Sequence, residues 1–433
     1  MSKKSANPVL GINEKPSLPQ WILLSFQHLF AMFGATILVP ILVDLSPSIA
    51  LISSGLGTLA FIIVTRGQVP SYLGSSFAFI APVIAAKEFG GPGAAMVGTF
   101  LAGLVYGIIA LLMKKFGIKW LMNLLPPIVV GPVIAVIGLS LSGTAVNQAM
   151  NIDGTYSSKH MLIALATLII TIVASTVFKG FFRIIPILIG IVSGYIISIF
   201  AGIVNFDKIK EADWFYIPDF IFPFADYTPE LSWKIALLMV PVAVVTIAEH
   251  IGHQMVLSNV VGKDLLKKPG LHASLFGDGL STMIAGLIGG VPTTTYGENI
   301  GVLAITRVYS IYVFIGAAVF AIAFGFIEKV AEIIHSIPNP VLGGVSILLF
   351  GIIASSGLKM LVDEKIDFND RRNLIIASVI LVLGIGGAVI EVGSYVHVEG
   401  MALSAIMGVI LNQVLPGKPK VQSDIFEKEV VNK

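Results

Sequence analysis

The amino-acid sequence predicts an all-α polytopic membrane protein, with 14 transmembrane segments in two inverted repeats of seven segments each. Three observations lead to this fold class. Charged residues make up only 12% of the chain, hydrophobic residues make up 56%, and the mean hydropathy is +0.93. Most lysines and arginines fall in alternate connecting segments. Two short polar segments occupy corresponding places in the two halves of the chain.

The composition excludes several classes of protein. Soluble domains carry about 25% charged residues, and a chain with half that share cannot cover a soluble surface. The sequence has no cysteine, so we expect no disulfide framework and no thiolate metal site. The net charge of +2 is too small to indicate a nucleic-acid partner. A soluble enzyme is excluded, and the expected surrounding is a lipid bilayer.

The predicted segments follow from apolar runs of about 20 residues, the length that crosses a bilayer as a helix. The third and tenth segments, residues 70–86 and 292–306, are short and rich in Gly, Ser and Thr. The segments begin near Trp21, Ser48, Pro70, Pro92, Leu125, His160, Ile184, Ser232, Leu271, Pro292, Val308, Pro338, Asn373 and Val398.

The distribution of positive charge predicts the orientation of these segments. With the N-terminus in the cytoplasm, 21 of the 27 lysines and arginines lie in inside connections and 6 in outside ones. Cytoplasmic connections of membrane proteins carry such an excess of Lys and Arg. We therefore expect a multi-pass protein with both termini in the cytoplasm.

Two pairs of similar segments indicate an internal repeat. Residues 70–77 and 292–299 both follow a valine, begin with proline and continue with small polar residues, at an offset of 222. Residues 127–131 and 340–344 are similar at an offset of 213. An odd number of spans in each repeat inverts the second copy. Interrupted helices in inverted repeats are typical of secondary transporters, with the substrate near the midplane. We place the repeats at residues 1–225 and 226–433, joined outside the membrane by residues 205–230.

Ionisable groups inside the membrane are candidates for function because they are costly to bury there. The acidic ones are Glu249, Asp278 and Glu298, and the histidines are His28, His250 and His253. Glu249 and His253 are four residues apart and share a helix face, where they can share a proton. Glu298 follows Gly297, at which a ligand can approach the backbone closely. The simpler interpretation is a buried pair that only holds helices together.

Motifs for metal or nucleotide chemistry are missing from the sequence. Residues 249–253 contain two histidines but lack the His-Glu-x-x-His order of zinc proteases. Residues 363–370 are acidic but lack the glycine and terminal Glu of a calcium-binding loop. No phosphate-binding glycine-rich loop occurs. We therefore expect neither a metal nor a cofactor.

Two motifs carry a resemblance to a known family. Gln27-His28-Leu-Phe-Ala-Met-Phe-Gly resembles the N-terminal signature of the nucleobase–ascorbate transporters. Residues 298–307, Glu-Asn-Ile-Gly-Val-Leu-Ala-Ile-Thr-Arg, fit the (Gln/Glu)-Asn-x-Gly, four residues, Thr-(Arg/Lys/Gly) motif of that family. The stretches around Glu249, His253 and Glu298 are similar to its bacterial uracil permease branch. The resemblance covers nearly the whole chain.

The resemblance implies a fold and a site. The core domain would comprise spans 1–4 and 8–11, and the gate domain spans 5–7 and 12–14. Short antiparallel β-strands would lie in spans 3 and 10, at residues 72–77 and 293–296. The Glu249 and Glu298 side chains and the backbone at Phe77 and Gly297 would bind uracil, and His253, with the two carboxyl groups, would couple proton movement. Candidate supporting residues are Tyr296, Asn299, His28, Gln27 and Ser76. The resemblance also implies a homodimer formed through the gate domain.

Three alternatives to a uracil:proton symporter stay open. The same residues could take another nucleobase such as xanthine. An anion exchanger of the same architecture is disfavoured, because two carboxylates would repel an anion. A membrane-embedded hydrolase using Glu249 and the histidines would need a metal.

Overall fold

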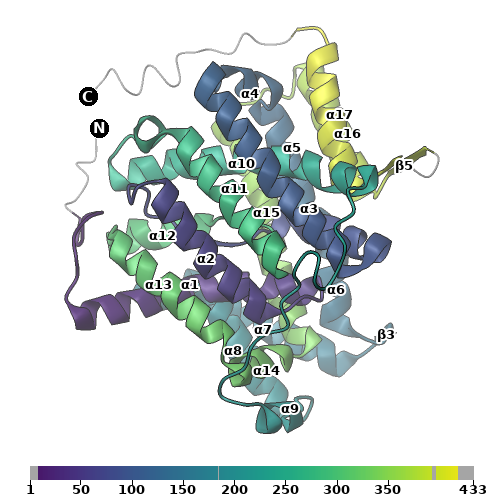
Figure 1. The fold of residues 1–433 in the computed structure, drawn as a ribbon. Coiled ribbons are helices and arrows are strands. Elements are labelled where there is room, and N and C mark those ends of the chain that lie inside the picture. Colours follow the sequence, from purple (N-terminus) through teal and green to yellow (C-terminus); the bar gives the residue numbers. More distant parts are fainter. Residues whose placement is uncertain (1–7, 184, 393–395, 418–433) are drawn as a thin grey trace.

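The computed structural model describes residues 8–183, 185–392 and 396–417 as a helical bundle, drawn in Figure 1. The predicted start of the seventh segment, at Ile184, lies outside the described residues. The first half contains α1 (Leu18–Leu42), α2 (Pro47–Val64), β1 (Leu73–Ser75), η1 (Phe77–Phe79), α3 (Ile80–Phe116), α4 (Lys119–Leu124), α5 (Pro127–Ser140), α6 (Ser142–Met150), β2 (Asn151–Ile152), β3 (Thr155–Tyr156), α7 (Ser158–Thr176), η2 (Gly180–Arg183), α8 (Pro186–Phe200) and α9 (Asp207–Glu211).

The second half begins with the long helix α10. Its elements are α10 (Trp233–Val261), η3 (Leu266–Gly270), α11 (Leu271–Ile288), β4 (Thr293–Thr295), α12 (Gly297–Thr306), α13 (Ile311–Gly325), α14 (Glu328–His335), α15 (Asn339–Asp363), α16 (Arg371–Ile385), β5 (Val389–Val392), β6 (Val396–Glu399) and α17 (Gly400–Val414).

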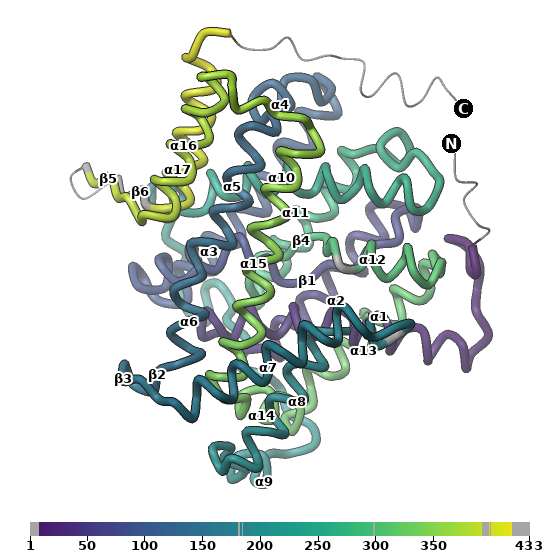
Figure 2. Tube along the Cα trace, turned by 180° about the vertical axis from the view of Figure 1, so that it is seen from behind, coloured from purple at the N-terminus to yellow at the C-terminus, as the bar shows by residue number. Residues whose placement is uncertain are grey.

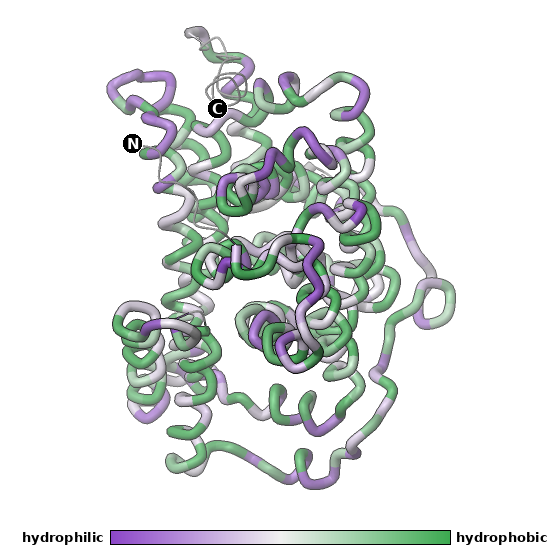
Figure 3. The backbone as a smooth tube through the Cα atoms, turned by 90° about the vertical axis from the view of Figure 1, so that its left-hand side faces the viewer, coloured by the Kyte–Doolittle hydropathy of each residue, from purple (hydrophilic) through white to green (hydrophobic). Residues whose placement is uncertain are grey.

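The length and apolarity of the helices confirm a mostly helical, multi-pass membrane protein. Among the described residues, eight helices are long and apolar enough to cross a bilayer, and the α13–α14 pair, bent by 81°, brings the number to nine. Helices α8 and α17 are apolar but shorter. Figure 3 shows that hydrophobic residues dominate the helices, while hydrophilic residues gather mainly in the connections. Outward faces keep large apolar side chains exposed, as a lipid-facing surface requires; Leu162 is 68% exposed.

Helix α3 is interrupted where the third predicted segment gives way to the fourth. Gly90 and Gly91 leave the helical conformation, and Gly91 has φ 71°. Glycine adopts a positive φ without the steric cost that other residues pay. Pro92 also disfavours helical geometry at the residue before it. The sequence prediction of two segments, with the second beginning near Pro92, agrees with this break.

The predicted antiparallel strands in the third and tenth segments are confirmed. Strand β1 pairs with β4, with Leu73 opposite Thr295 and Ser75 opposite Thr293. Beyond the strands, Ser76 N donates to Pro292 O at 2.9 Å, and Tyr296 N donates to Tyr72 O at 3.3 Å. Figure 2 shows both strands near the middle of the molecule. Backbone groups that would be unpaired in an interrupted membrane helix are thereby satisfied within the protein.

A threonine on a neighbouring helix holds the first residue of each strand. Thr58 of α2 accepts from Leu73 N at 3.0 Å and donates to Leu73 O at 3.4 Å. Thr282 of α11 accepts from Thr293 N at 3.3 Å and donates to Thr293 O at 2.9 Å. The two strands, 220 residues apart in the sequence at these positions, are therefore anchored in the same way.

The helices fall into two sets by their packing. Helices α1, α2, α3, α10, α11 and α13 pack against one another around the strands. Helices α5, α6, α7, α8, α15, α16 and α17 pack mainly among themselves. The sets meet where α10 contacts α5 and α17 and where α1 contacts α8. Helix α10, which carries Glu249, therefore faces both sets.

Close helix contacts depend on small residues, as is common in membrane proteins. A β-carbon on Gly103 of α3 would lie 2.5 Å from the carbonyl oxygen of Gly279 in α11, and one on Gly279 would lie 2.7 Å from the carbonyl oxygen of Gly103. Because both obstacles are backbone atoms, only glycine at each position permits this approach.

Residues 212–232 cross the ends of several helices before α10 begins. The Tyr216 hydroxyl donates to Ser48 Oγ of α2 at 2.7 Å. Burial raises the pKa of the Tyr216 phenol above its ordinary value, so it stays protonated and donates. Ile221 N donates to Ile288 O, at the end of α11. This connection binds α2 and α11 together at one end of the bundle.

Candidate functional site

The middle of α10 presents the predicted carboxylate–imidazole pair. Glu249 Oε1 lies 4.0 Å from His253 Nε2, so the two residues do share a helix face. Their side chains are 31% and 23% exposed, respectively. The pair is therefore neither sealed in the core nor open to bulk solvent. This separation is short enough for strong electrostatic interaction and for proton exchange after a small movement or through one water.

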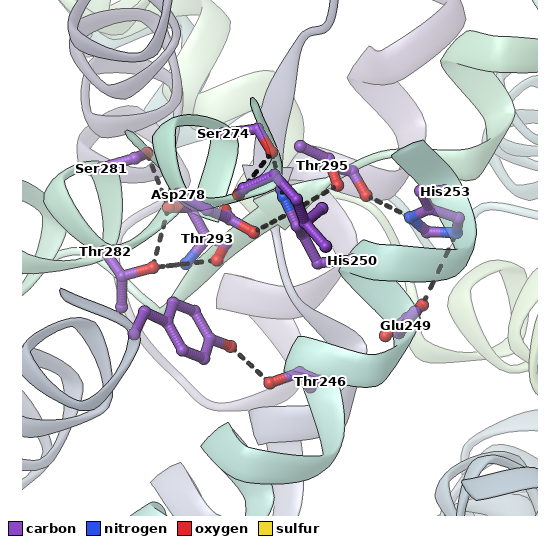
Figure 4. Close-up of polar contacts among 12 residues, drawn as sticks. Thr246, Glu249, His250, His253, Ser274, Asp278, Ser281, Thr282, Thr293 and Thr295 are labelled. Carbon is purple, nitrogen blue, oxygen red and sulfur yellow. Dashed lines mark hydrogen bonds and ion pairs between the residues drawn. The ribbon is translucent and has the colours of Figure 1, made fainter. Parts of the chain in front are cut away.

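A backbone carbonyl fixes the protonation of one nitrogen of His253. His253 Nδ1 lies 2.9 Å from the carbonyl oxygen of Thr295, in β4. A carbonyl oxygen can only accept a hydrogen bond, so Nδ1 carries a proton. Nε2, the nitrogen that faces Glu249, is then the one that gains or loses a proton. Figure 4 shows His253 between Thr295 and Glu249.

The break between β4 and α12 brings the backbone against this imidazole. Gly297 is the first residue of α12, and a β-carbon added there would lie 2.9 Å from His253 Nε2. Glycine is therefore needed at this position for the observed packing. Glu298 is the second residue of α12, but its side chain lies outside the described part of the structure. The predicted closeness of the Glu298 and Glu249 side chains therefore stays a prediction.

Phe77 begins η1, separated from the end of β1 by one residue, as Gly297 begins α12, separated from the end of β4 by one residue. The Phe77 side chain is half-buried, and its ring meets Phe350 of α15 edge-on, with centroids 6.4 Å apart. Element η1 contacts α10. The first N–H groups of a helix have no acceptor within that helix, so both breaks present donors.

Two supporting residues, Tyr296 and Ser76, lie next to the paired strands β1 and β4. The Tyr296 hydroxyl donates to Ser75 O at 3.1 Å and lies 3.3 Å from Thr36 Oγ1. Its ring covers Gly74, where a β-carbon would lie 2.4 Å from the ring. Tyr296, which follows β4, therefore helps to hold β1 and β4 together. Ser76 is buried, and its hydroxyl has no hydrogen-bond partner among the described residues.

The remaining supporting residues form a separate polar group between α1 and α12. His28 and Asn299 are fully buried, and the two side chains lie next to each other. The His28 ring packs against the Phe314 ring of α13, with ring centroids 4.7 Å apart. Gln27 precedes His28 on α1 and is half-buried. Within the described residues, neither side chain of the His28–Asn299 pair makes a hydrogen bond that meets standard geometry.

Sequence reasoning missed a second buried pair, His250 with Asp278. His250 Nδ1 lies 2.9 Å from Asp278 Oδ2, and both side chains are 1% exposed. The two residues lie on different helices, 28 positions apart, so no local spacing indicates their contact. The rarity of acidic residues inside the predicted spans was the available signal that Asp278 has a buried polar partner. Over the described residues, no group of three or more His, Cys, Asp or Glu side chains is placed to hold a metal.

Comparison with known proteins identifies the family. Residues 19–393 match the model of a family described as "Permease family" (Xan_ur_permease). The chain belongs to this permease family. This permease is 64% identical to the uracil permease of Bacillus caldolyticus over 422 residues, which cover 97% of this chain and 98% of that protein. It is 60% identical to the uracil permease of Bacillus subtilis strain 168, with 99% of each chain covered.

More distant relatives extend the comparison. This permease is 46% identical to the uracil permease of Escherichia coli K12, over 98% of this chain and 96% of that one. The family match and these relatives confirm the resemblance found in the sequence. Because permeases are transporters and not enzymes, the hydrolase alternative is set aside.

Solved structures share the fold at low identity. The transmembrane domain of the cyanobacterial bicarbonate transporter BicA matches with a TM-score of 0.64 at 15% identity, covering 92% of this chain and 98% of that domain. Murine Slc26a9, an anion transporter in the inward-facing state, matches with a TM-score of 0.69 at 10% identity, over 93% of this chain and 68% of that one. At such identity the likeness concerns the fold alone.

Proposed function

We propose that this permease imports uracil together with a proton by alternating access. Relatives that match it over nearly the full length are named uracil permeases. The observation that carries the proposal is the convergence of Glu249, His253 and Gly297 from two elements, at the positions that the resemblance assigns to substrate binding and proton coupling.

The chemistry of uracil suits this arrangement. Uracil is planar and neutral near pH 7, with two N–H donors and two carbonyl acceptors. The carboxyl groups of Glu249 and Glu298 accept from its N–H edges, and the backbone N–H groups at Phe77 and Gly297 donate to its carbonyls. A site built from buried hydrogen-bonding groups rejects analogues that leave those groups unpaired. Such a site also disfavours an anion, because two carboxylates repel it.

Proton coupling follows from the His253 tautomer. Thr295 occupies Nδ1, so Nε2 exchanges a proton with the Glu249 carboxyl group, which lies 4.0 Å away. Uracil carries no charge, so import with one proton moves one positive charge inward. The membrane potential then contributes about 2.3 kcal/mol per 100 mV to accumulation.

The architecture proposed for this mechanism has fourteen spans in two inverted repeats. The matching Thr58–Leu73 and Thr282–Thr293 anchors support the repeat, since inverted copies use the same contacts at corresponding positions. The two helix sets support a core domain of spans 1–4 and 8–11 and a gate domain of spans 5–7 and 12–14. Movement of the core against the gate would alternate access to the site, which lies on α10 where the sets meet.

The cellular setting belongs to the same proposal. The excess of Lys and Arg in alternate connections supports insertion in the cytoplasmic membrane with both termini in the cytoplasm. We further propose a homodimer formed through the gate domain.

Ligand-dependent thermal stabilisation tests the substrate assignment. A ligand that binds only the folded state raises the melting temperature, and at equal concentration the ligand with the lower dissociation constant raises it more. Purified protein is heated with uracil, thymine, cytosine, xanthine or bicarbonate. We expect the largest shift with uracil. A larger shift with xanthine would reassign the nucleobase, and a shift with bicarbonate alone would indicate an anion transporter.

A further inference from the structure

The buried His250–Asp278 pair lies directly behind the proposed site and has no role in the mechanism above. His250 is on α10, one residue after Glu249, and points away from it toward α11. Both side chains of the pair are 1% exposed, and their closest atoms are 2.9 Å apart. Burying two ionisable side chains costs desolvation free energy, so the presence of this pair calls for a role besides stability.

The contacts of His250 account for both ring nitrogens. Nδ1 faces Asp278 Oδ2, and Nε2 lies 3.0 Å from Ser274 Oγ. The Ser274 hydroxyl itself donates to the carbonyl oxygen of Leu271 at 3.0 Å. With the serine hydrogen used in this way, Nε2 donates to Ser274 Oγ. Nδ1 then donates to Asp278 Oδ2, while Asp278 Oδ1 is buried and has no hydrogen-bond partner among the described residues.

One residue joins this pair to His253. Thr295 Oγ1 lies 3.3 Å from His250 Nδ1, and the Thr295 carbonyl oxygen accepts from His253 Nδ1 at 2.9 Å. Thr295 is 1% exposed and is the last residue of β4. Figure 4 shows its two oxygens directed to the two histidines. The side chain and the backbone of Thr295 therefore contact different imidazoles.

We propose that the His250–Asp278 pair is a positioning group that acts on His253 through Thr295. The Nδ1–H of His250 is shared between Asp278 Oδ2 at 2.9 Å and the Thr295 hydroxyl oxygen at 3.3 Å, which positions Thr295. The Thr295 carbonyl then fixes the His253 ring with Nε2 directed toward Glu249. This inference rests on the proposed function, because it takes His253 as the partner of Glu249, a residue proposed to bind uracil. It adds three positioning residues: Thr295, which contacts His253 directly, and His250 and Asp278, which act on His253 through Thr295.

Thr295→Val tests the contact between Thr295 and His250 with little change of shape, since it replaces the hydroxyl with a methyl group. Thr294→Val is the matched control. Thr294 neighbours Thr295 on β4, is 5% exposed, and its hydroxyl has no partner among the described residues. The measured quantity is the uracil dissociation constant of the purified full chain. We expect Thr295→Val to weaken binding roughly three- to tenfold, the effect of one hydrogen bond. Thr294→Val should bind like the unmodified protein, and Thr295→Ser should restore affinity.

Repeating the Thr295→Val measurement in a His253→Gln protein distinguishes an effect that acts through His253 from a general structural effect on the site. In His253→Gln protein, Thr295→Val should cause no further loss, because the residue it positions is gone. Equal losses in both backgrounds would overturn the proposal, as would a Thr295→Val protein with unchanged affinity. If Thr295→Val does not fold, Asp278→Asn is measured in the same two backgrounds with the same expectations. Failure of unmodified protein to bind uracil would instead refute the proposed function, so the two failures are distinguishable.

Discussion

A β-carbon on Gly297 would lie 2.9 Å from Nε2 of His253, closer than real β-carbons approach other atoms. Gly297→Ala should therefore displace the imidazole from Glu249. A misplacement of about 1 Å at a functional group can cost a hundredfold, so we expect uracil affinity to fall roughly ten- to a hundredfold. Titration of purified protein with uracil measures this.

Gly301→Ala provides the control for that substitution. Gly301 lies one turn further along α12, and a β-carbon there has nothing within 4 Å. Alanine is also the better helix former. Uracil affinity should be unchanged in Gly301→Ala, and equal losses in the two variants would show that α12 is sensitive to any substitution.

Loss of the titratable imidazole should uncouple transport from protons. His253→Gln keeps a polar side chain beside Thr295 but cannot carry a proton at Nε2. We expect exchange of labelled for unlabelled uracil to continue, while accumulation driven by a pH gradient stops. His335→Gln, at an exposed position of α14, should accumulate uracil normally. Gradient-driven accumulation by His253→Gln protein would remove His253 from the coupling mechanism.

Substitution at the closest helix crossing should lower stability. Gly103→Ala places a β-carbon 2.5 Å from the Gly279 carbonyl, a backbone obstacle that cannot rotate away. Overpacking of this kind costs about 1–3 kcal/mol, so the ligand-free melting temperature should fall. Gly107→Ala, one turn along α3, meets only Phe276 at 3.9 Å and should melt normally. Equal melting temperatures for the two variants would contradict the observed packing.

Cysteine labelling can test the proposed orientation, because the natural chain has no cysteine. Lys208→Cys, in α9, should react with a membrane-impermeant maleimide added to intact cells. Lys263→Cys, after α10, should react only once the membrane is opened. Both positions are exposed in the folded protein. The opposite pattern would invert the topology, and labelling of both in intact cells would refute an odd number of spans between them.

The sequence predicted the parts of the site that depend on local spacing. The small polar residues and breakers predicted two interrupted spans, the family resemblance implied that these contain strands, and the Glu249–His253 pair followed from a spacing of four on one helix. The His250–Asp278 contact joins two helices and depends on their packing angle, which single-residue patterns do not encode. The contacts of Thr295 with both His250 and His253 could not be predicted from the sequence, because they depend on the position of β4 relative to α10. The pairing of β5 with β6 and the bend between α13 and α14 depend likewise on tertiary packing.

Coupled movement of uracil and a proton through this site can be measured directly. Purified protein is reconstituted in vesicles that enclose a pH-sensitive dye, without a starting pH gradient, and labelled uracil is added outside at a negative internal potential. We expect uracil uptake to be accompanied by acidification of the lumen, and both signals to fall together in Gly297→Ala at a low uracil concentration. Uracil uptake without acidification, or acidification that does not depend on uracil, would contradict coupled movement.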